Sequence, residues 1–550
     1  MNGAQALIRT LVDAGATTCF TNPGTSEMHF VAALDSVPEM RAVLATFEGV
    51  ATGAADGYAR ISDRPGVTLL HLGPGLGNGL ANLHNARKAK TPIVNIVGDH
   101  ATYHTQYDAQ LQSDIETVAR NVSTWVRTSA STSALAGDAA EAIAASIGPP
   151  GQVATLILPA DVSWSDGAAP AALPASAPAA PTPPATTETV AQALRSGSRS
   201  AILLGGRALR EDALIAAAKI AAATGVELLA ETFPARLERG AGLPAPERIA
   251  YFPEFAAVQM RGLKHLVLVD AKAPVTFFAY PGKPSYLVPD GCQVHELAPP
   301  ESDVLASLEQ LVEALGASAK QPARQPPARA ARPTGQLTAE KVCQAIGAVL
   351  PEGAIVSDES ITSGQTLPAN TAGAPRHDLL ALTGGAIGQG LPVAVGAAVA
   401  APDRPVLALE ADGSSLYTIQ SLWTMVREQL NVTVVLFNNR SYGILNVELQ
   451  RVQAEGAGPK AKSQLDLSRP DVDFVSLAQG FGVPSKRVDS ADQLLKELER
   501  AIAEPGPHVI EVLVPNVLSD RQLRAMPIAL RALGHMPRPV AQAVKRRLSP

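Results

Sequence analysis

The sequence has few cysteines and no excess of positive charge. Its 550 residues include three cysteines, Cys19, Cys292 and Cys343, which lie far apart and form no CxxC pair. This spacing argues against a disulfide scaffold and a cysteine-rich zinc site, and it suits a reducing cytoplasm. The net charge of −6 comes from 45 Lys and Arg against 51 Asp and Glu. No basic surplus therefore exists to neutralise nucleic-acid phosphates.

A long hydrophobic run is also missing. The most apolar stretch, residues 390–401, is about a dozen residues long, which is too short to span ~30 Å of hydrocarbon. The N-terminal pattern predicts an amphipathic helix carrying Arg9 and Asp13, without the apolar core or cleavage site of a signal peptide. We therefore expect a cytoplasmic protein without a membrane anchor.

Two segments of biased composition divide the chain. Residues 167–187 consist almost entirely of Ala, Pro, Ser, Thr and Gly, and residues 316–335 are basic and rich in Pro and Ala. Neither segment can bury enough apolar surface to offset its ordering entropy, so both are predicted linkers. The expected domains are 1–166, 188–315 and 336–550.

Each expected domain alternates short apolar runs with helical patterns. Buried strands are expected at 67–71, 93–97, 154–158, 201–205, 226–230, 265–270, 354–358, 406–412, 432–438 and 508–514. Continuous apolar strands separated by helices imply parallel sheets that are covered on both faces. We expect an α/β protein of three consecutive open parallel-sheet domains. In such sheets, ligands bind beyond the carboxyl ends of the strands.

Two polar residues end neighbouring strands of the third domain. Asp412 and Asn439 are 27 residues apart, with a helical run expected at 417–429 between them. A right-handed crossover would place both at one sheet edge. Carboxylate, carboxamide and loop carbonyl oxygens suit Mg²⁺, and the following Gly413 and Ser414 open a helix whose N–H groups can face phosphate oxygens. A plain strand-to-helix turn is the alternative for this Asp-Gly-Ser sequence.

This spacing resembles the thiamine-diphosphate motif, GDG followed by 24–27 residues and NN. The resemblance implies that Asp412, Asn439 and the main-chain carbonyl of Ser441 hold the metal. The first glycine of the family pattern is Ala411 here. A methyl group at that position could crowd the diphosphate.

The N-terminal domain carries a second part of the resemblance. The family needs a carboxylic acid at N1′ of the aminopyrimidine, where it assists removal of the C2 proton. Glu48 matches it, because the sequence that follows, GVATGAADGYAR, is nearly the family pattern. An ordinary carboxylate at a helix N-terminus is the structural alternative.

The chain is similar to the group that contains benzoylformate decarboxylase, pyruvate oxidase and acetohydroxyacid synthase. The loop Asn22-Pro23-Gly24-Thr25-Ser26-Glu27 resembles the decarboxylase loop that binds the cofactor and the substrate carboxylate, with Thr25 at the position of its serine. The alternative is a Pro-Gly turn with Thr25 or Ser26 as helix N-cap.

His71 falls at the position of a catalytic histidine of the decarboxylases, where it would donate or accept protons. It precedes a Gly-Pro-Gly sequence expected to form a loop, which resembles the synthases instead. A satisfied core histidine is the alternative. His100 and His104, after the next strand, are further candidates for substrate contact or are solvated side chains.

The third domain supplies the remaining expected cofactor contacts. Gly385 and Ile387 match the segment that supports the bent form of thiamine, and a core isoleucine is the alternative for Ile387. Tyr442 follows the metal loop. Further along, Asn446 and Glu448 are more polar than expected beside a phenyl pocket, which favours a smaller or polar substrate.

The middle domain departs from benzoylformate decarboxylase. The region expected to hold its second catalytic histidine, residues 273–281, contains none, and Phe278 or Tyr280 is expected there. Gly205-Gly206-Arg207 resembles both an FAD-associated segment and the vestigial form in enzymes without flavin, so FAD stays open.

These features predict a thiamine-diphosphate- and Mg²⁺-dependent 2-oxo acid decarboxylase, which releases CO₂ and an aldehyde and could also catalyse carboligation. The alternatives are an acetolactate-synthase-like carboligase and a non-catalytic cofactor-binding homologue. The resemblance also implies a homo-oligomer, a dimer or a homotetramer. Each site would combine Glu48 and His71 of one chain with Asp412 and Asn439 of another.

Overall fold

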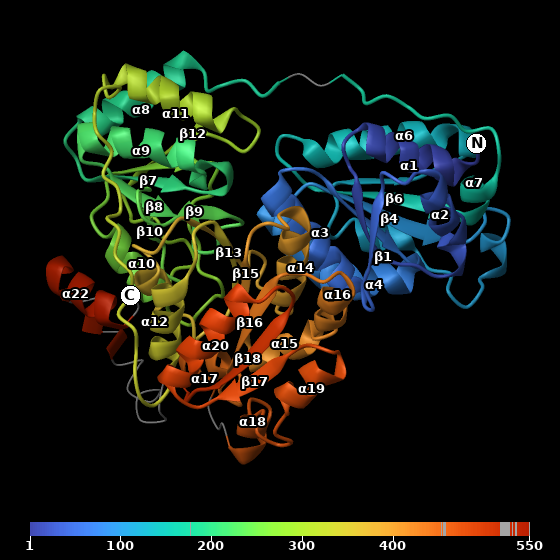
Figure 1. Cartoon of the computed structure of the whole chain (residues 1–550). Coiled ribbons are helices and arrows are strands. Elements are labelled where there is room, and N and C mark those ends of the chain that lie inside the picture. Colours follow the sequence, from blue (N-terminus) through green and yellow to red (C-terminus); the bar gives the residue numbers. More distant parts are fainter. Residues whose placement is uncertain are drawn as a thin grey trace.

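The computed structural model describes residues 1–175, 178–452, 454, 458–516, 529–530, 532–533 and 536–548. It contains three sheets (Figure 1), and this confirms the predicted α/β class with three parallel-sheet units. None of the helices among these residues is long and apolar enough to cross a membrane.

The first sheet has six parallel strands in the order β2-β1-β3-β4-β6-β5. The strands are β1 (Thr18–Asn22), β2 (Arg41–Leu44), β3 (Gly66–Leu70), β4 (Ile93–Asp99), β5 (Trp125–Thr128) and β6 (Val153–Pro159). The helices are α1 (Gly3–Asp13), α2 (Met28–Ala33), α3 (Glu48–Ser62), α4 (Leu72–Ala89), α5 (Ile115–Ala119), α6 (Thr132–Ile147) and α7 (Ala160–Trp164). Strands β3, β4 and β6 are almost fully buried because helices cover both faces of the sheet.

The second sheet has five parallel strands in the order β10-β8-β7-β11-β12. They are β7 (Ser200–Leu204), β8 (Glu227–Ala230), β10 (Glu247–Arg248), β11 (His265–Val269) and β12 (Gln293–Ala298). The helices of this unit are α8 (Pro184–Arg195), α9 (Glu211–Thr224), α10 (Pro253–Met260) and α11 (Val304–Ala314). The chain enters it through residues 178–183, which precede α8.

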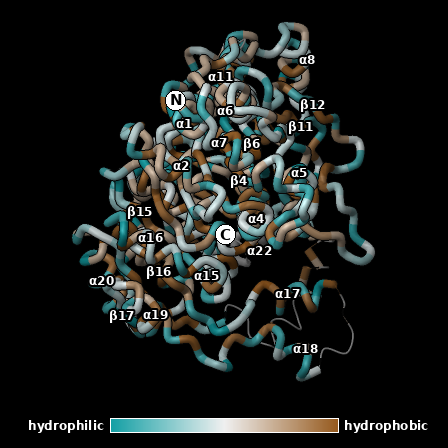
Figure 2. Tube along the Cα trace, turned by 90° about the vertical axis from the view of Figure 1, so that its right-hand side faces the viewer, coloured by the Kyte–Doolittle hydropathy of each residue, from teal (hydrophilic) through white to brown (hydrophobic). Residues whose placement is uncertain are grey.

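The third sheet has seven strands in the order β17-β18-β16-β15-β13-β14-β9. They are β9 (Leu237–Arg239), β13 (Ala354–Glu359), β14 (His377–Ala381), β15 (Val406–Ala411), β16 (Val432–Asn438), β17 (Ser485–Val488) and β18 (His508–Leu513). The helices are α12 (Ala339–Val349), α13 (Leu367–Asn370), α14 (Gly390–Ala400), α15 (Asp412–Thr418), α16 (Ser421–Arg427), α17 (Gly443–Arg451), α18 (Pro459–Ser463), α19 (Phe474–Gly480), α20 (Ala491–Ala503) and α22 (Arg538–Leu548). Helix α18 has no buried residue and lies at the mainly hydrophilic edge of the trace in Figure 2.

Two local expectations were wrong. The helical run expected at 417–429 is two short helices, α15 and α16, and α15 already begins at Asp412. The Gly-Pro-Gly sequence at 73–75 is not a loop, because it lies in the first turn of α4 directly after His71. The backbone of Leu72 takes a positive φ of 51° there, which turns the strand abruptly into the helix.

Helices α3 and α14 join the first and third units (Figure 1). A Cβ on Gly57 would lie 2.1 Å from the carbonyl oxygen of Val393, and one on Gly396 would lie 1.8 Å from that of Ala54. Only residues without a side chain permit two helix backbones to approach so closely. The two units therefore pack closely against each other through these helices.

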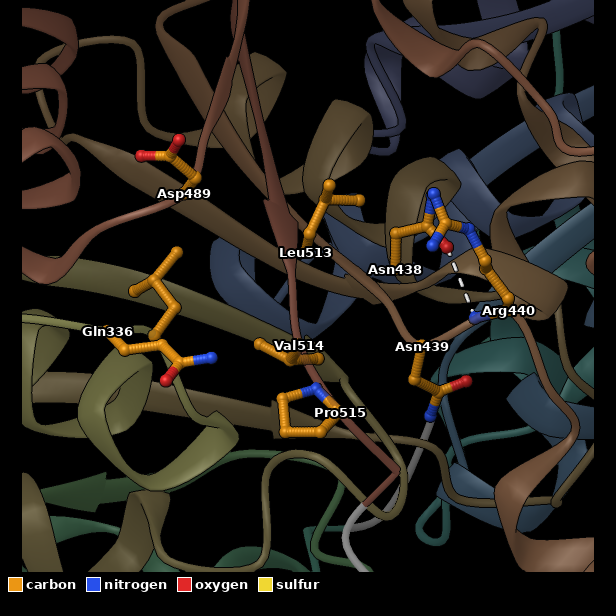
Figure 3. Close-up of a pocket in the computed structure, with 9 residues that line it drawn as sticks. Gln336, Asn438, Asn439, Arg440, Asp489, Leu513, Val514 and Pro515 are labelled. Atoms are coloured by element: carbon orange, nitrogen blue, oxygen red, sulfur yellow. Dashed lines mark hydrogen bonds between the residues drawn. The ribbon is translucent and has the colours of Figure 1, made fainter.

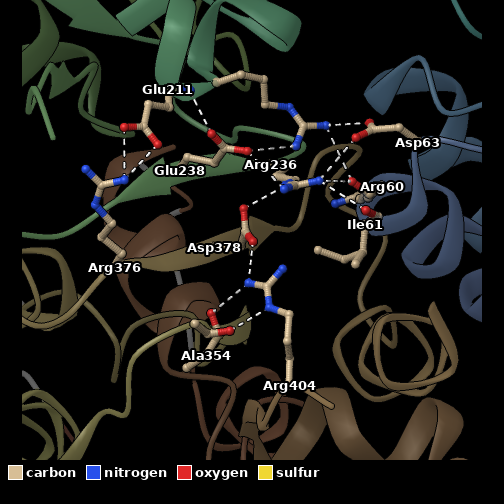
Figure 4. Close-up of polar contacts among 12 residues, drawn as sticks. Arg60, Ile61, Asp63, Glu211, Arg236, Glu238, Ala354, Arg376, Asp378 and Arg404 are labelled. Atoms are coloured by element: carbon tan, nitrogen blue, oxygen red, sulfur yellow. Dashed lines mark hydrogen bonds and ion pairs between the residues drawn. The ribbon is translucent and has the colours of Figure 1, made fainter. Parts of the chain in front are cut away.

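Strand β9 ties the middle unit to the third sheet. It lies between β8 and β10 in the chain, yet it pairs antiparallel with β14. The neighbouring Arg236 binds Asp378 on β14 at 2.6 Å, Glu238 at 2.9 Å and Asp63 after α3 at 3.4 Å (Figure 4). One partly buried guanidinium thus contacts all three units.

Candidate active site

The carboxyl ends of β15 and β16 bring together the residues expected to hold the metal. Because these strands are paired in parallel, Asp412 and the segment 439–441 emerge at the same sheet edge. Oδ2 of Asp412 accepts a hydrogen bond from the amide of Arg440 at 2.6 Å, and Asn439 Oδ1 accepts one from the amide of Ser441 at 2.9 Å. Burial raises the pKa of the Asp412 carboxyl to about 6, a cost that a bound cation would offset.

The start of α15 differs from the expected phosphate-facing turn. The amide of Gly413 donates to Oδ1 of Asp412 at 2.9 Å, so in this conformation it is not directed at a ligand. A Cβ on Gly413 would lie 2.4 Å from Cε1 of Tyr442, which places the tyrosine ring directly over this turn. Ser414 is buried beside it.

A pocket of about 370 Å³ borders the same edge. Figure 3 shows Asn438 and Arg440 at one end of it, and Gln336 and Asp489 at the other. The side chain of Asn438 accepts from the amide of Arg440 and donates to the buried Glu511 at 2.7 Å, which fixes the turn around Asn439.

The segment 384–390 lies at the meeting point of the first and third units. Asn82 on α4 donates to the carbonyl of Gly49 at 2.8 Å and to that of Gly388 at 3.2 Å, and Thr418 on α15 donates to the same Gly388 carbonyl at 3.0 Å. The half-buried Ile387 precedes this point by one residue. Asn82 thus connects the start of α3 to Gly388, and Thr418 connects Gly388 to the end of α15, within a single chain.

A buried carboxylate binds the backbone of the segment 384–390. Glu359, at the end of β13, accepts the amides of Gly388 at 2.8 Å and Gly390 at 2.5 Å. Burial raises the pKa of Glu359 to about 7, and burial beside Glu359 raises the pKa of Glu410 further above its usual range. The segment carrying Gly385 and Ile387 is thus fixed by its backbone.

Glu48 begins α3, as predicted. It is 9% exposed, and its Oε2 accepts a hydrogen bond from Nδ2 of Asn78 at 3.0 Å. A Cβ on Gly75 would lie 3.1 Å from its other oxygen. Gly75, in the first turn of α4, therefore leaves room for the Glu48 carboxyl group. No side chain at position 75 presses against Oε1 of Glu48.

His71 is paired with a carboxylate that the sequence analysis did not select. Oε2 of Glu27, a fully buried residue, lies 2.8 Å from Nδ1 of His71 and 2.7 Å from the amide of Gly24. The imidazole packs on Gly24, where a Cβ would lie 2.3 Å from Nδ1. The ring is 23% exposed, so its Nε2 side is the part that a ligand can reach.

The loop after β1 is only partly as expected. Gly24, not Thr25 or Ser26, occupies the cap position of the 3₁₀ turn Thr25–Glu27. Thr25 is exposed, while Ser26 Oγ lies 2.9 Å from Glu27 and 3.5 Å from Nδ1 of His71. Asn22 donates to the carbonyl of Ala45 at 3.0 Å, which fixes the strand end before Pro23.

Comparison with known proteins identifies the family. Residues 1–120 match the model "Thiamine pyrophosphate enzyme, N-terminal TPP binding domain", and residues 363–512 match the corresponding C-terminal domain. The chain is 60% identical over 525 residues to a Mycobacterium tuberculosis protein named "Putative acetolactate synthase large subunit IlvX", with 94% of this chain and 100% of that protein covered.

The chain belongs to the thiamine pyrophosphate enzyme family.

Two other proteins to which the chain is similar are named decarboxylases. Benzoylformate decarboxylase of Pseudomonas aeruginosa is 28% identical over 529 residues, covering 90% of this chain and 96% of that protein. The fold also matches a solved Rhodococcus jostii thiamine diphosphate-dependent 4-hydroxybenzoylformate decarboxylase with a TM-score of 0.82 and 23% identity, covering 94% of this chain and all of that one.

The donor set at the sheet edge fits a thiamine pyrophosphate enzyme. Asp412 supplies a buried carboxylate, and Asn439 supplies an amide oxygen in the same turn. These hard oxygen donors suit Mg²⁺ and, through it, a diphosphate.

The glycine turn of the middle unit does not fit a flavin diphosphate. The amide of Gly206 donates to Glu231 at 2.9 Å, and the amide of Arg207 donates to Asp270 at 2.9 Å. Asp270 also binds Lys90 of the first unit at 2.6 Å. The N–H groups that would bind phosphate at this end of the sheet are thus bonded to carboxylates, which repel an anion.

The region 273–281 contains no histidine and is aromatic, as expected. However, Phe277, not Phe278, lies against Gly385, since a Cβ on Gly385 would lie 2.4 Å from its Cζ. Tyr280 is buried, whereas Phe278 is 53% exposed. The other two candidate histidines, His100 and His104, have ring centroids 5.2 Å apart.

Glu27, Glu359 and Asn82 are the site residues that the sequence analysis missed. Glu27 follows β1, Glu359 ends β13 and Asn82 lies within α4. A single acidic or amide residue in such places has many ordinary roles. Glu27 is tightly enclosed in the structure, since a Cβ on Gly98 would lie 1.6 Å from its Oε1, but this contact leaves no signal in the sequence.

Proposed function

We propose that the chain is a thiamine-diphosphate- and Mg²⁺-dependent 2-oxo acid decarboxylase that releases CO₂ and an aldehyde, with carboligation as a related activity. The observation that carries this choice is the pairing of Glu27 with His71 at 2.8 Å beside the loop after β1. An oriented histidine in that place can supply the proton that an aldehyde product needs.

The cofactor would be held from the third unit. Asp412, Asn439 and the carbonyl of Ser441 would bind Mg²⁺, and Gly413 and Ser414 would lie next to the diphosphate. Thiamine diphosphate, when bound, supplies a carbon nucleophile that adds to the keto carbon and accepts the electron pair left as CO₂ departs.

The ring end of the cofactor would meet further residues. Gly385 and Ile387 would support its bent form, and Tyr442 would close over the turn at Gly413. Glu48 would hold a proton at the aminopyrimidine, a role supported by its small exposure and by Asn78, which binds its Oε2 and leaves Oε1 available.

The substrate would lie between these residues and the loop after β1. Thr25 would orient the substrate carboxylate, with Asn22, Pro23 and Gly24 shaping the backbone there. Because Glu27 engages Nδ1 of His71, Nε2 is the nitrogen that would exchange the proton with the substrate-derived carbon or oxygen.

An acetolactate-synthase-like carboligase is the second candidate, and the name of the 60% identical Mycobacterium tuberculosis protein favours it. We propose that FAD is absent in either case, since Glu231 and Asp270 occupy the amides of the Gly205–Arg207 turn. A non-catalytic homologue is disfavoured because Glu48 and Asp412 are both present.

We further propose a dimer or tetramer with sites shared between chains. Large side chains near the site elements are exposed in the single chain: Tyr107 by 69%, Tyr417 by 52% and Leu416 by 39%. A second copy covering them would bury apolar area that is otherwise in water. The cytoplasmic location stays a prediction from the sequence.

The test is a cofactor titration followed by product analysis. Calorimetry with thiamine diphosphate and Mg²⁺ should give saturable binding, and a panel of 2-oxo acids should give CO₂ with an aldehyde. Acetolactate from pyruvate without free aldehyde would favour the carboligase, and binding without CO₂ from any panel member would contradict both.

A further inference from the structure

Three amide side chains lie along one face of α4. Asn78, Asn82 and Asn85 are four and three residues apart, so the helical period places them on the same side of the helix. Asn82 is 2% exposed and Asn85 is fully buried. Buried amides nearly always bind partners, so the atoms that these two contact indicate what they hold.

Asn82 binds two carbonyls that belong to different units. Its Nδ2 donates to the carbonyl of Gly49 at 2.8 Å and to that of Gly388 at 3.2 Å, which uses both N–H groups of the amide. Gly49 directly follows Glu48, and Gly388 directly follows Ile387. One amide therefore binds the backbone beside two residues that the proposed function assigns to the cofactor.

Asn85 extends this contact along the segment 384–390. It donates to the carbonyl of Ala386 at 2.8 Å and accepts from the amide of Ala386 at 3.2 Å. It also donates to Oδ1 of Asn82 at 3.1 Å, which fixes the orientation of that amide. Helix α4 thus binds the residues on both sides of Ile387.

The contact between the first and third units does not rest on Asn82 alone. Helices α3 and α14 already approach each other closely at Gly57 and Gly396. Gly53, nearer the start of α3, leaves room for the amide, because a Cβ there would lie 2.9 Å from Nδ2 of Asn82. Asn82 therefore adds position at the start of α3 and before the start of α14, where the proposed cofactor residues lie.

We propose that Asn82 is a positioning residue that holds Glu48 and Ile387 in place for the cofactor. Each of the two is held through the carbonyl of the residue that follows it, so the effect is the same whether they serve one site or two adjoining sites. This role rests on the proposed function, which assigns Glu48 to the aminopyrimidine and Ile387 to the bent form of thiamine.

The first test uses the protein without cofactor. The amides of Gly388 and Gly390 bind Glu359, so they report on the segment 384–390 by hydrogen–deuterium exchange. Asn82→Ala should speed their exchange by about fivefold, the factor that corresponds to the loss of one typical buried hydrogen bond.

The second test uses the protein loaded with thiamine diphosphate and Mg²⁺. At saturating cofactor, Asn82→Ala should slow exchange of the C2 proton, followed by NMR, by about tenfold or more, since a displaced acid–base group loses most of its effect. Asn82→Asp has the same size and keeps the acceptor for Asn85 but lacks both donors, and should be slowed at least as much. Calorimetry should show a smaller loss of cofactor affinity than of exchange rate.

Asn95 provides the matched control. It is fully buried on β4, where its amide donates to Thr155 at 3.0 Å and accepts from Thr68 at 2.7 Å. Asn95→Ala should lower the thermal midpoint as Asn82→Ala does, but leave both exchange rates unchanged. Thr418→Val, which removes only the second donor to the Gly388 carbonyl, should speed amide exchange in the same direction and provides a milder variant if the Asn82 variants do not fold.

Unchanged amide exchange in both Asn82→Ala and Thr418→Val, or unchanged C2 exchange in Asn82→Ala, would overturn the positioning role and leave the decarboxylase proposal intact. Equal losses in Asn95→Ala would show general destabilisation and would also overturn it. If the wild-type protein itself does not exchange the C2 proton of the cofactor, the proposed function fails and the role of Asn82 fails with it.

Discussion

Glu27 and His71 form a buried carboxylate–imidazole pair with Oε2 and Nδ1 2.8 Å apart. The two residues lie 44 positions apart in the chain, and the parallel pairing of β1 with β3 brings them to one sheet edge. The carboxylate also accepts the amide of Gly24, so one group fixes both the histidine ring and the loop before Thr25. A fixed ring presents a defined nitrogen to the substrate.

Glu27→Gln should lower kcat by about 10-fold or more, on the scale of general acid–base effects, because the amide can hold the ring but places no negative charge beside it during proton transfer. His71→Ala should lower turnover more than it lowers thiamine diphosphate affinity. Steady-state rates and cofactor calorimetry on both variants and on the double variant provide the measurement. If the two losses simply multiply, the residues act independently and the pair has no shared role.

Glu48→Gln should leave cofactor binding nearly unchanged and slow turnover by about 10²-fold or more, since the amide cannot exchange a proton with the aminopyrimidine. Exchange of the C2 proton of bound cofactor, followed by NMR, isolates this step. Asn78→Ala removes the hydrogen bond to Glu48 but keeps the carboxyl, and is expected to cost less. A Glu48→Gln enzyme with full activity would refute the assignment.

Removal of divalent metal should abolish activity and weaken cofactor binding, because Asp412 and Asn439 offer a metal site rather than cationic side chains for the diphosphate. Dialysis against a chelator and return of Mg²⁺ should restore both properties. Asp412→Ala should prevent the recovery. Asp403→Ala, on an exposed side chain before the other end of β15, serves as the control. Full cofactor binding in the chelated protein would contradict the metal site.

Glu231→Gln should stabilise the protein at high pH. Burial raises the pKa of Glu231 from 4.5 to about 7. Between these values the folded state holds a proton that the unfolded state releases, so the wild-type protein loses stability as the pH rises from 4.5 to 7, by about 1–3 kcal/mol. Glutamine keeps an acceptor for Gly206 without this penalty. The thermal midpoints at pH 5 and pH 8 should differ less in the variant than in the wild-type protein. An equal difference in both proteins would contradict the raised pKa of Glu231.

Gly57→Ala should destabilise the protein by about 2 kcal/mol, because the new methyl group would lie against the backbone of Val393 in the α3–α14 contact. Gly137→Ala is the matched control, since nothing lies within 4 Å of a Cβ there and alanine favours the α6 helix by up to ~1 kcal/mol. Denaturant midpoints should shift in opposite directions. A shift in the same direction would show that helix propensity outweighs the contact.

The sequence was sufficient for the elements whose pattern is local. Apolar runs located strands such as β15 and β16, and Asp412 was placed at the correct sheet edge because parallel pairing brings strand ends together. Glu48 was recognised at the start of α3 from its own surrounding sequence.

Relationships between distant residues were not accessible in this way. Nothing in the sequence near Glu27 indicates that it pairs with His71. Strand β9 has only three residues, which is too short to show a strand pattern of its own. The partnership of Glu448 with Tyr251 likewise depends on packing between the middle and third units. Long-range contacts of single side chains leave no periodic signal.

Strand β9 has a practical consequence for protein engineering. It pairs with β14 and is the edge strand on that side of the seven-stranded sheet. A recombinant fragment that begins after residue 335 would expose the amides and carbonyls of β14 at a bare rim, which is prone to self-association. When the middle unit is exchanged between homologues, residues 237–239 and the β14 strand with which they pair should therefore come from the same protein.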